Sequence, residues 1–302
     1  MFDSIIIGSG PAGLTAAIYI SQAGYKTAVI IGSEVGGNIA KTSHLINYPG
    51  LIGPITGQQL IDNLMQQCYN SNVEFLFGNA LEFNKINNIF NIKTDFDSYS
   101  AKTLILATGS SPRILNLPYE SNFFGKGIHT CATCDGAFYK NKDVAVIGGG
   151  NSAAEYAFYL SNIANKVYIL YRKNKLKVSN STYTNLISKS NIEILYNTEI
   201  AEYYNESSLS KIKLNNGNNL SIQGIFYALG HVPNTSIIQT IYQDKICNQS
   251  CLYDQELIDN NGIEGLFAAG DCTKINYQQA ITAAADGAIA GMKVNNLLQI
   301  IK

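Results

Sequence analysis

Two glycine-rich turns, about 140 residues apart, constrain the fold of this chain more than any other feature. The first reads Gly-Ser-Gly-Pro-Ala-Gly over residues 8–13 and follows a short apolar run. We expect a strand over residues 5–7 and a helix from about Pro11 to Ala23, with Gly24 as its C-terminal cap. Glycines at this spacing allow a tight turn and let a pyrophosphate approach the backbone at the helix N-terminus. In its strand–turn–helix context, the motif predicts a dinucleotide site rather than an ordinary glycine-rich turn.

The same pattern returns later in the chain. A strand predicted over residues 144–147 runs into Gly-Gly-Gly-Asn-Ser-Ala at 148–153, where Ala153 replaces the third glycine, an accepted variant. Two further segments also echo each other: LILATGSSPR at 104–113 and IFYALGHVPN at 225–234 each lead from an apolar strand into a small-residue turn with Gly and then Pro. The sequence therefore predicts an internal duplication and an α/β fold with two Rossmann-like dinucleotide-binding domains.

Length and composition agree with this interpretation. The 302 residues suggest two domains of roughly 150 residues each. A net charge of −1 gives no reason to expect nucleic acid or an anionic membrane surface as a partner. The first ten residues lack a basic region and a cleavage site, and no run of about 18 apolar residues exists, so we expect a soluble, intracellular protein. In that environment a close pair of cysteines indicates a catalytic or metal-binding site rather than a structural disulfide.

The residues that follow the second strand of each unit differ in charge. After KTAVIIG comes Glu34, about 20 residues beyond the first turn, where an acid suits a ribose hydroxyl. After NKVYIL comes a basic run with Tyr171, Arg172, Lys173 and Lys177. A positive cluster at this point favours a 2′-phosphate, hence NADP over NAD. The alternative is a solvated lysine-rich loop, and we expect Tyr171 to face solvent at the strand end.

The segment CATCDGAFYK begins with Cys131 and Cys134. A structural zinc site needs four ligands, usually two cysteine pairs. The other close pair is Cys247 and Cys251, and His129 lies near Cys131 in the chain, so a metal site is conceivable. Nothing else in the sequence is typical of a metalloprotein, so we expect no metal. C-x-x-C spacing lets a disulfide form within one turn, so a redox pair fits better. The acid that follows, Asp135, could exchange protons with the thiolate or act as a helix N-cap. Cys68, Cys247, Cys251 and Cys272 are expected to be small buried side chains or bystanders.

Taken together, these motifs resemble the low-molecular-weight thioredoxin reductases, in order and over nearly the whole chain. The segments that carry the resemblance are GSGPAG, EVGGNI, NYPG, ATGSSPR, CATCDGAFY, GGGNSAAE, ALGHVPN, GLFAAGDC and QQAITAAADG. The most specific feature is CATCDG ahead of GGGNSA, because larger relatives carry their cysteines in the first domain, where EVGGNIAKTSH has none.

The resemblance implies a discontinuous FAD-binding domain, residues 1–112 and 244–302, with a pyridine-nucleotide domain, 113–243, inserted into it. It further implies that Cys134 faces the flavin and Cys131 the partner, with Asp135 as a catalytic acid. The FAD contacts that it implies lie at Gly8, Ser9, Gly10, Pro11, Ala12, Gly13, Glu34, Gly36, Gly37, Asn38, Asn47, Thr108, Gly109, Gly270, Asp271, Gln278, Gln279 and Ala280. The NADPH contacts lie at Gly148, Gly150, Asn151, Ser152, Ala153, Arg172, Lys173 and Lys177.

Two departures from the family pattern keep alternatives open. The family usually has His-Arg-Arg-x-x-x-Arg at the basic loop, where this chain has Tyr-Arg-Lys-x-x-x-Lys. It also commonly has Arg-Gln-Ala near the flavin, where this chain has Gln278-Gln279-Ala280. We expect a homodimeric, cytoplasmic (or plastid stromal) flavoenzyme that reduces thioredoxin with electrons from NADPH. The alternatives are the same disulfide reductase fed by ferredoxin or another flavin, an NADPH–flavin reductase of another electron carrier, and a redox-sensing scaffold.

Overall fold

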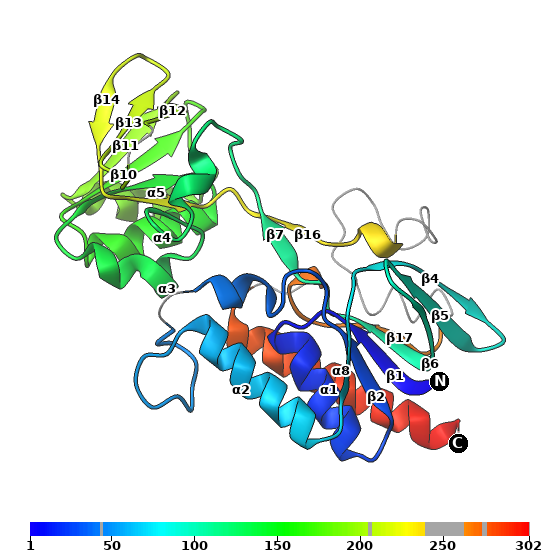
Figure 1. Cartoon of the computed structure of the whole chain (residues 1–302). Helices are drawn as coiled ribbons and strands as arrows, with labels where there is room; N and C mark the ends of the chain where they lie inside the picture. The colour runs from blue at the N-terminus through cyan, green and yellow to red at the C-terminus, as the bar shows by residue number, and fades with distance from the viewer. Residues whose placement is uncertain (43–44, 205–206, 239–262, 274–276, 302) are drawn as a thin grey trace. The chain divides into compact units, whose positions relative to one another are not determined.

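The computed structural model describes residues 1–42, 45–204, 207–238, 263–273 and 277–301. It divides into two compact units, one formed by Met1–Ser111 and Val232–Lys302, the other by Pro112–His231 (Figure 1). The second unit is thus inserted into the first. The later of the two predicted domain boundaries, at 243–244, lies outside the described residues. Among the described helices, none is both long and apolar enough to cross a bilayer.

The first unit is built on a mixed sheet in which β3, β2, β1 and β6 are neighbours, all parallel, and β17 extends the parallel part beside β6. Strands β5 and β4 continue the sheet in antiparallel fashion. Its elements are β1 (Phe2–Ile7), α1 (Pro11–Gln22), β2 (Thr27–Ile30), η1 (Gly37–Lys41), α2 (Gly57–Asn70), β3 (Glu74–Leu76), β4 (Ala80–Ile86), β5 (Ile89–Thr94), β6 (Ser98–Leu106), β17 (Leu266–Ala268), η4 (Gly270–Cys272) and α8 (Ala280–Ile300).

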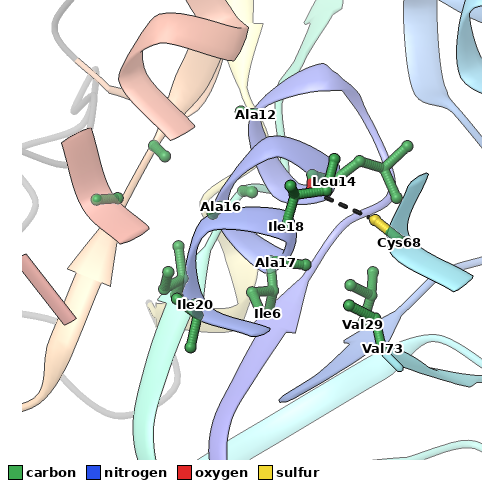
Figure 2. Close-up of a cluster of buried hydrophobic side chains, with 14 of the residues drawn as sticks. Ile6, Ala12, Leu14, Ala16, Ala17, Ile18, Ile20, Val29, Cys68 and Val73 are labelled. Atoms are coloured by element: carbon green, nitrogen blue, oxygen red, sulfur yellow. Dashed lines mark hydrogen bonds between the residues drawn. The ribbon is translucent and has the colours of Figure 1, made fainter. Parts of the chain in front are cut away.

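Helix α1 lies in the middle of the core on one face of this sheet. Its small residues let α8 approach closely, and Gly287 of α8 must be glycine because a Cβ there would collide with the carbonyl of Ala12. Figure 2 shows the cluster of buried apolar side chains around α1. In it, the Cys68 thiol of α2 donates to the Leu14 carbonyl at 3.4 Å. The other sheet face is covered by apolar side chains of β4 and β5, including Phe83 and Phe90. The predicted first strand and helix are confirmed, and Gly24 follows the C-cap with φ +87°.

The second unit is also built on a sheet with helices on one face. A parallel sheet in the order β11-β10-β9-β15-β8 carries α4 and α5 on one face and the antiparallel sheet β12-β13-β14 on the other. The fold therefore confirms the predicted α/β architecture with two Rossmann-like domains, and the second unit has three layers. The elements are η2 (Glu120–Phe123), β8 (Ile128–His129), α3 (Ala132–Asp135), η3 (Gly136–Tyr139), β9 (Asp143–Ile147), α4 (Asn151–Ser161), β10 (Lys166–Tyr171), α5 (Asn180–Ser188), β11 (Ile192–Tyr196), β12 (Ile200–Tyr203), β13 (Lys211–Leu214), β14 (Asn219–Ser221) and β15 (Gly224–Tyr227).

The chain passes between the units twice, and the two passages pair with each other. Strand β7 (Ser110–Pro112) and strand β16 (His231–Pro233) form a two-stranded ribbon. The Arg113 amide donates to the Gly230 carbonyl at 3.0 Å, and the Asn234 amide donates to the Gly109 carbonyl at 3.0 Å. The two echoing segments of the sequence, ATGSSPR and ALGHVPN, therefore become the two strands of this connection.

A buried carboxylate holds the start of the second unit against its antiparallel layer. Glu120, 3% exposed, accepts from the amides of Leu115 and Leu117 at 2.9 and 3.0 Å. It also accepts from the Tyr227 hydroxyl at 2.6 Å, which in turn bonds the Tyr203 hydroxyl at 2.5 Å. Burial, with the nearby Tyr203 and Glu120, raises the pKa of Tyr227 far above its usual range, so the phenol stays protonated.

Removing the Tyr227 hydroxyl should destabilise the protein. Y227F leaves both Glu120 and the Tyr203 hydroxyl with one partner fewer in a buried site, which we expect to cost about 1–3 kcal/mol of unfolding free energy. Urea unfolding followed by circular dichroism measures this loss. Y204F is the matched control, since the Tyr204 hydroxyl bonds Asn219 in a more exposed position at 2.6 Å. Equal losses in the two variants would contradict this account.

Candidate functional site

The predicted cysteine pair forms a disulfide in the structure. Cys131 and Cys134 are bonded, with their Cα atoms 5.3 Å apart. The short helix α3 makes this possible, since Cys131 is its N-cap and its sulfur accepts from the Cys134 amide at 3.2 Å. The two cysteines are neither fully buried nor fully exposed. The pair can therefore open and close without unfolding its surroundings.

The acid after the pair takes a helix N-cap position, but its side chain does not cap the helix. Asp135 is the last residue of α3, and although it precedes η3 its side chain makes no capping hydrogen bond there. Its Oδ2 instead lies 3.0 Å from Nδ1 of His129, which ends the preceding strand β8. The expected N-cap role is therefore confirmed in position only, because the carboxylate pairs with a residue that precedes the turn. Asp135 directly follows Cys134, so the carboxylate belongs to the same short segment as the cysteine pair.

The other cysteines of the described chain are chemically quiet. Burial raises the pKa of the Cys68 thiol to about 12 and that of the Cys272 thiol to about 11. Both predictions of buried bystanders are confirmed. Cys247 and Cys251 lie outside the described residues, and within the described ranges no group of three or more His, Cys, Asp and Glu side chains is arranged to hold a metal ion.

The two glycine turns have matching backbone contacts. Gly8 donates to the Ile30 carbonyl and Gly148 to the Leu170 carbonyl, at 2.9 and 3.1 Å. A Cβ on either residue would collide with the end of the adjacent strand, at Ala107 or Ala228, and both glycines have positive φ. The helices that follow, α1 and α4, begin without a side-chain cap, so their first amides are open to an anion.

Tyr171 is buried beneath the second turn. Its ring is 8% exposed and lies where a side chain on Gly149 would be, so the expectation of a solvent-facing tyrosine was wrong. Gly149 also accepts from the Lys177 amide at 2.6 Å. These two contacts hold the basic loop against the turn, with the side chains of Arg172, Lys173 and Lys177 exposed. The turn residues Gly150, Asn151, Ser152 and Ala153 and the three cations therefore lie in one region.

The first turn is tied to the segment after β2. The Ser9 hydroxyl, buried within the turn, donates to the Ile31 carbonyl at 2.8 Å and accepts from the Gly36 amide at 3.1 Å. A Cβ on Gly10 would meet its nearest atom, the Gly36 carbonyl oxygen, at 3.8 Å, so the turn is open there. The Glu34 carboxylate is exposed and pairs with Lys41 at 2.7 Å. A ribose at Glu34 would have to share it with Lys41.

Further predicted residues of the first unit meet around one point. Asn38 donates to the Ser110 carbonyl at 2.6 Å, and Gln278 reaches the Ser110 hydroxyl at 3.5 Å. Asn47 donates to Gln279 at 3.2 Å, directly before Ala280 opens α8. The neighbouring Thr108 and Gly109 follow β6 in the same unit. Ser110 was not predicted, although it lies in the quoted ATGSSPR; its role depends on contacts over 70 residues away.

Asp271 has an oxygen that is buried with no partner among the residues that the structure describes. Burial raises the pKa of its carboxyl to about 6, and the nearby Asp286 adds to the effect. Asp286, missed by the sequence analysis, accepts from the Gly270 amide at 2.7 Å and thereby holds the turn after β17. An orphaned buried carboxylate oxygen calls for a donor from a bound molecule.

The predicted residues thus form two groups, each within one unit. The first unit holds the turn at residues 8–13 together with the residues around Ser110 and Asp271. The second unit holds the disulfide, Asp135, the turn at residues 148–153 and the basic loop. Each group combines a dinucleotide-type turn with further polar side chains, and only the second contains a reactive sulfur pair among the described residues.

Comparison with known proteins gives the same picture. Residues 2–287 match the family described as Pyridine nucleotide-disulphide oxidoreductase. The chain is 37% identical over 303 residues to the thioredoxin reductase of Borreliella burgdorferi, covering 98% of this chain and 92% of that protein. It is 36% identical over 313 residues to the glucosaminate ammonia-lyase of Pseudomonas fluorescens, covering 97% and 95%. The crystal structure of thioredoxin reductase from Streptococcus pyogenes aligns with a TM-score of 0.87 at 31% identity, covering 99% of both chains.

Sequence identity, family match and fold therefore agree over nearly the full length, and the resemblance found in the motifs is confirmed. The chain belongs to the pyridine nucleotide-disulphide oxidoreductases and, within them, to the thioredoxin reductases, a family of FAD-dependent oxidoreductases.

Proposed function

We propose that this chain reduces the disulfide of thioredoxin through FAD and the Cys131–Cys134 pair, with electrons from NADPH. The observation that carries the proposal is the disulfide itself, closed within one turn and followed by Asp135, in the second of two units that each have a dinucleotide turn. A lyase needs no such pair, which favours the reductase over the ammonia-lyase chemistry of the relative from Pseudomonas fluorescens.

The first unit fits FAD. The open space at Gly10 and the uncapped start of α1 suit a pyrophosphate, and the orphaned Asp271 oxygen suits a hydroxyl of the ribityl chain. We propose Glu34, Asn38, Asn47, Thr108, Gly109, Gln278, Gln279 and Ala280 as further contacts. Held by these residues, FAD would supply two-electron transfer between NADPH and the disulfide.

The second unit fits NADPH. Its turn at residues 148–153 suits the pyrophosphate, and Arg172, Lys173 and Lys177 suit the 2′-phosphate. The tyrosine in place of the family's histidine packs under Gly149 and keeps these cations beside the turn. We therefore infer that the altered basic loop still serves NADPH.

The cysteines carry the electrons onward. Two electrons and two protons open the disulfide to a pair of thiols. The Cys131 thiolate attacks one sulfur of thioredoxin's disulfide, and the other thioredoxin sulfur leaves with the bonding pair and takes a proton. Asp135 takes the proton of the Cys134 thiol, and the Cys134 thiolate then attacks the Cys131 sulfur. This restores the internal disulfide, and thioredoxin's second sulfur leaves with the bonding pair and takes that proton from Asp135.

The deciding experiment is anaerobic mixing of the FAD-loaded protein with excess NADPH while the flavin absorbance is followed, then addition of oxidised thioredoxin. We expect rapid bleaching with NADPH, slower bleaching with NADH, and reoxidation by thioredoxin. Flavin that stays oxidised with both nucleotides but bleaches with dithionite would refute NADPH as donor and direct the search to ferredoxin or another flavin. Bleaching without reoxidation by thioredoxin would refute the acceptor.

Substituting Gly149 should weaken nucleotide binding without affecting FAD. In G149A the new Cβ displaces the Tyr171 ring and with it the basic loop, so we expect KM for NADPH to rise about tenfold, equivalent to about 1.4 kcal/mol of binding energy. Steady-state kinetics with a bacterial thioredoxin measures this. G150A is the matched control, because a Cβ there meets nothing within 4 Å in the protein. G150A therefore leaves Tyr171 and the basic loop in place, and any change in its KM comes from contact of the new methyl group with NADPH. An unchanged KM in G149A would contradict the proposed role of the loop.

We also propose a cytoplasmic (or plastid stromal) homodimer. The helix pair α1 and α8 supports a second copy as partner, because Tyr19, Ile289 and Met292 on these helices are 42%, 49% and 47% exposed. Light scattering on the FAD-loaded protein tests this, and a monomeric mass at micromolar concentration would refute it.

A further inference from the structure

His129 occupies a built position next to the redox pair. It ends β8, whose pairing with β15 sets Phe226 opposite His129, and it stands two residues before Cys131. Its ring is 8% exposed and stacks on Phe226 at a centroid distance of 5.4 Å and an angle of 27°. Tyr139 meets the ring edge-on at 5.3 Å. The imidazole is therefore held in one orientation by aromatic side chains on two sides.

Both ring nitrogens of His129 have hydrogen-bond partners. Nδ1 lies 3.0 Å from Oδ2 of Asp135, and Nε2 lies 2.7 Å from the Tyr139 hydroxyl. Tyr139 is 7% exposed, and burial, with the nearby Asp135 charge, raises its pKa to about 12. The phenol therefore keeps its proton at working pH. When the ring is neutral, the phenol donates to Nε2, and Nδ1 carries the ring proton and donates to Asp135.

We propose that His129 is a positioning residue for Asp135, with Tyr139 fixing its tautomer, so that the carboxyl group that serves the exchange with thioredoxin is held in one orientation beside Cys134. This proposal rests on the proposed reduction of thioredoxin. The chain places no other described side chain in hydrogen-bond contact with the Asp135 carboxylate, and a free carboxylate next to a glycine would sample several rotamers.

Other titratable groups surround this arrangement and bear on its pH dependence. The phenol of Tyr156 on α4 donates to the Thr130 carbonyl at 2.7 Å, and burial, Glu155 and Asp135 together raise its pKa to about 12. Lys142 lies over the Tyr139 ring at 5.4 Å. Strand β15 contributes only the apolar Phe226 to this face. Of these groups, Asp135 is the one that directly follows Cys134 in the chain.

The test separates the two half-reactions in the FAD-loaded enzyme. Flavin reduction by NADPH is followed anaerobically, and the reduced enzyme is then mixed with an oxidised bacterial thioredoxin across the pH range. H129F removes both polar contacts while keeping an aromatic ring. H129N keeps a donor near the position of Nδ1 and so restores the contact with Asp135. F226L is the matched control, since it loosens the packing of the ring but leaves both hydrogen bonds possible.

We expect H129F to slow the thioredoxin half-reaction about tenfold or more and to shift its pH profile, with flavin reduction by NADPH unchanged. H129N should recover most of the rate, and F226L should keep the wild-type pH profile. A wild-type rate and profile in H129F would overturn the proposal. So would equal defects in H129N and H129F, which would assign His129 a packing role only. A wild-type enzyme that does not reduce thioredoxin would instead refute the proposed function.

Discussion

C134S should reduce the turnover of thioredoxin by NADPH by about 10³-fold or more while FAD remains bound. The disulfide is the only reactive sulfur pair among the described residues, since Cys68 and Cys272 are buried and protonated. Without Cys134 the internal disulfide cannot form, so electrons have no covalent route to the partner. The residues that we propose as FAD contacts lie in the other unit, so we expect this change to leave FAD binding intact.

The same variant should also trap its partner. In C134S the Cys131 thiolate can still attack, but nothing resolves the mixed disulfide. A thioredoxin that keeps only its attacking cysteine, activated with thionitrobenzoate, should form a covalent complex that dithiothreitol reverses. C131S should form none, and C68S should behave as wild type, because Cys68 is buried in the core at 0% exposure. A complex with C131S but not with C134S would exchange the two roles, and loss of FAD from C134S would contradict the separation of the two sites.

G13A should yield a protein that has lost most of its FAD. A Cβ on Gly13 would collide with the Gly8 carbonyl oxygen and come within 3.2 Å of the Ile6 side chain, so α1 must move away from the turn. Because backbone lies on one side and a strand of the core on the other, the strain cannot be relieved by a side-chain rotation. We expect both the flavin content of the purified protein and its unfolding free energy to fall, the latter by about 1–3 kcal/mol.

A second glycine of the same turn separates the two effects. In G10A the new Cβ would lie 3.8 Å from its nearest neighbour, an ordinary contact, and Gly10 has φ −73°, which alanine adopts freely. G10A should therefore keep the stability of the apoprotein but bind FAD more weakly, because the methyl group occupies space beside the pyrophosphate. The ratio of flavin to protein absorbance, and chemical unfolding of the apoprotein, measure the two quantities. A stable, fully yellow G13A would refute the assignment of this turn.

The sequence allowed the fold and the outline of both sites to be predicted because their signals are local. A glycine turn between a strand and a helix, and two cysteines within one helical turn, are complete within a dozen residues. The partners of those elements were not predictable in this way. Tyr171 was expected in solvent because the residues around it are charged, yet its ring fills the space left by Gly149. The contact between Tyr227 and Glu120 joins residues 107 positions apart, and no pattern near either residue indicates it.

The partner of Asp135 was also not predictable from the sequence around it. The two roles expected from the sequence placed its partner in the backbone of a helix start or in the cysteine pair just before it. The structure pairs it with His129, which the sequence analysis had weighed only as a metal ligand. Asp286 likewise supports the turn at Gly270 from within α8, whose first half, residues 280–291, is mostly alanine and glycine. Supporting residues of this kind depend on the assembled fold, whereas the residues they support belong to motifs.

The ribbon of β7 and β16 bears on how such a molecule could arise and change. Since the inserted unit leaves and re-enters its host through two adjacent, paired strands, its two ends are held together, and the host sheet can be completed whatever lies between them. A segment with neighbouring ends can be exchanged for another in one genetic event, without a change in the fold of the domain that receives it. The unit that carries the reactive sulfurs, and that we propose meets the electron donor, can thus be replaced as a module, while the unit that we propose for the flavin is kept.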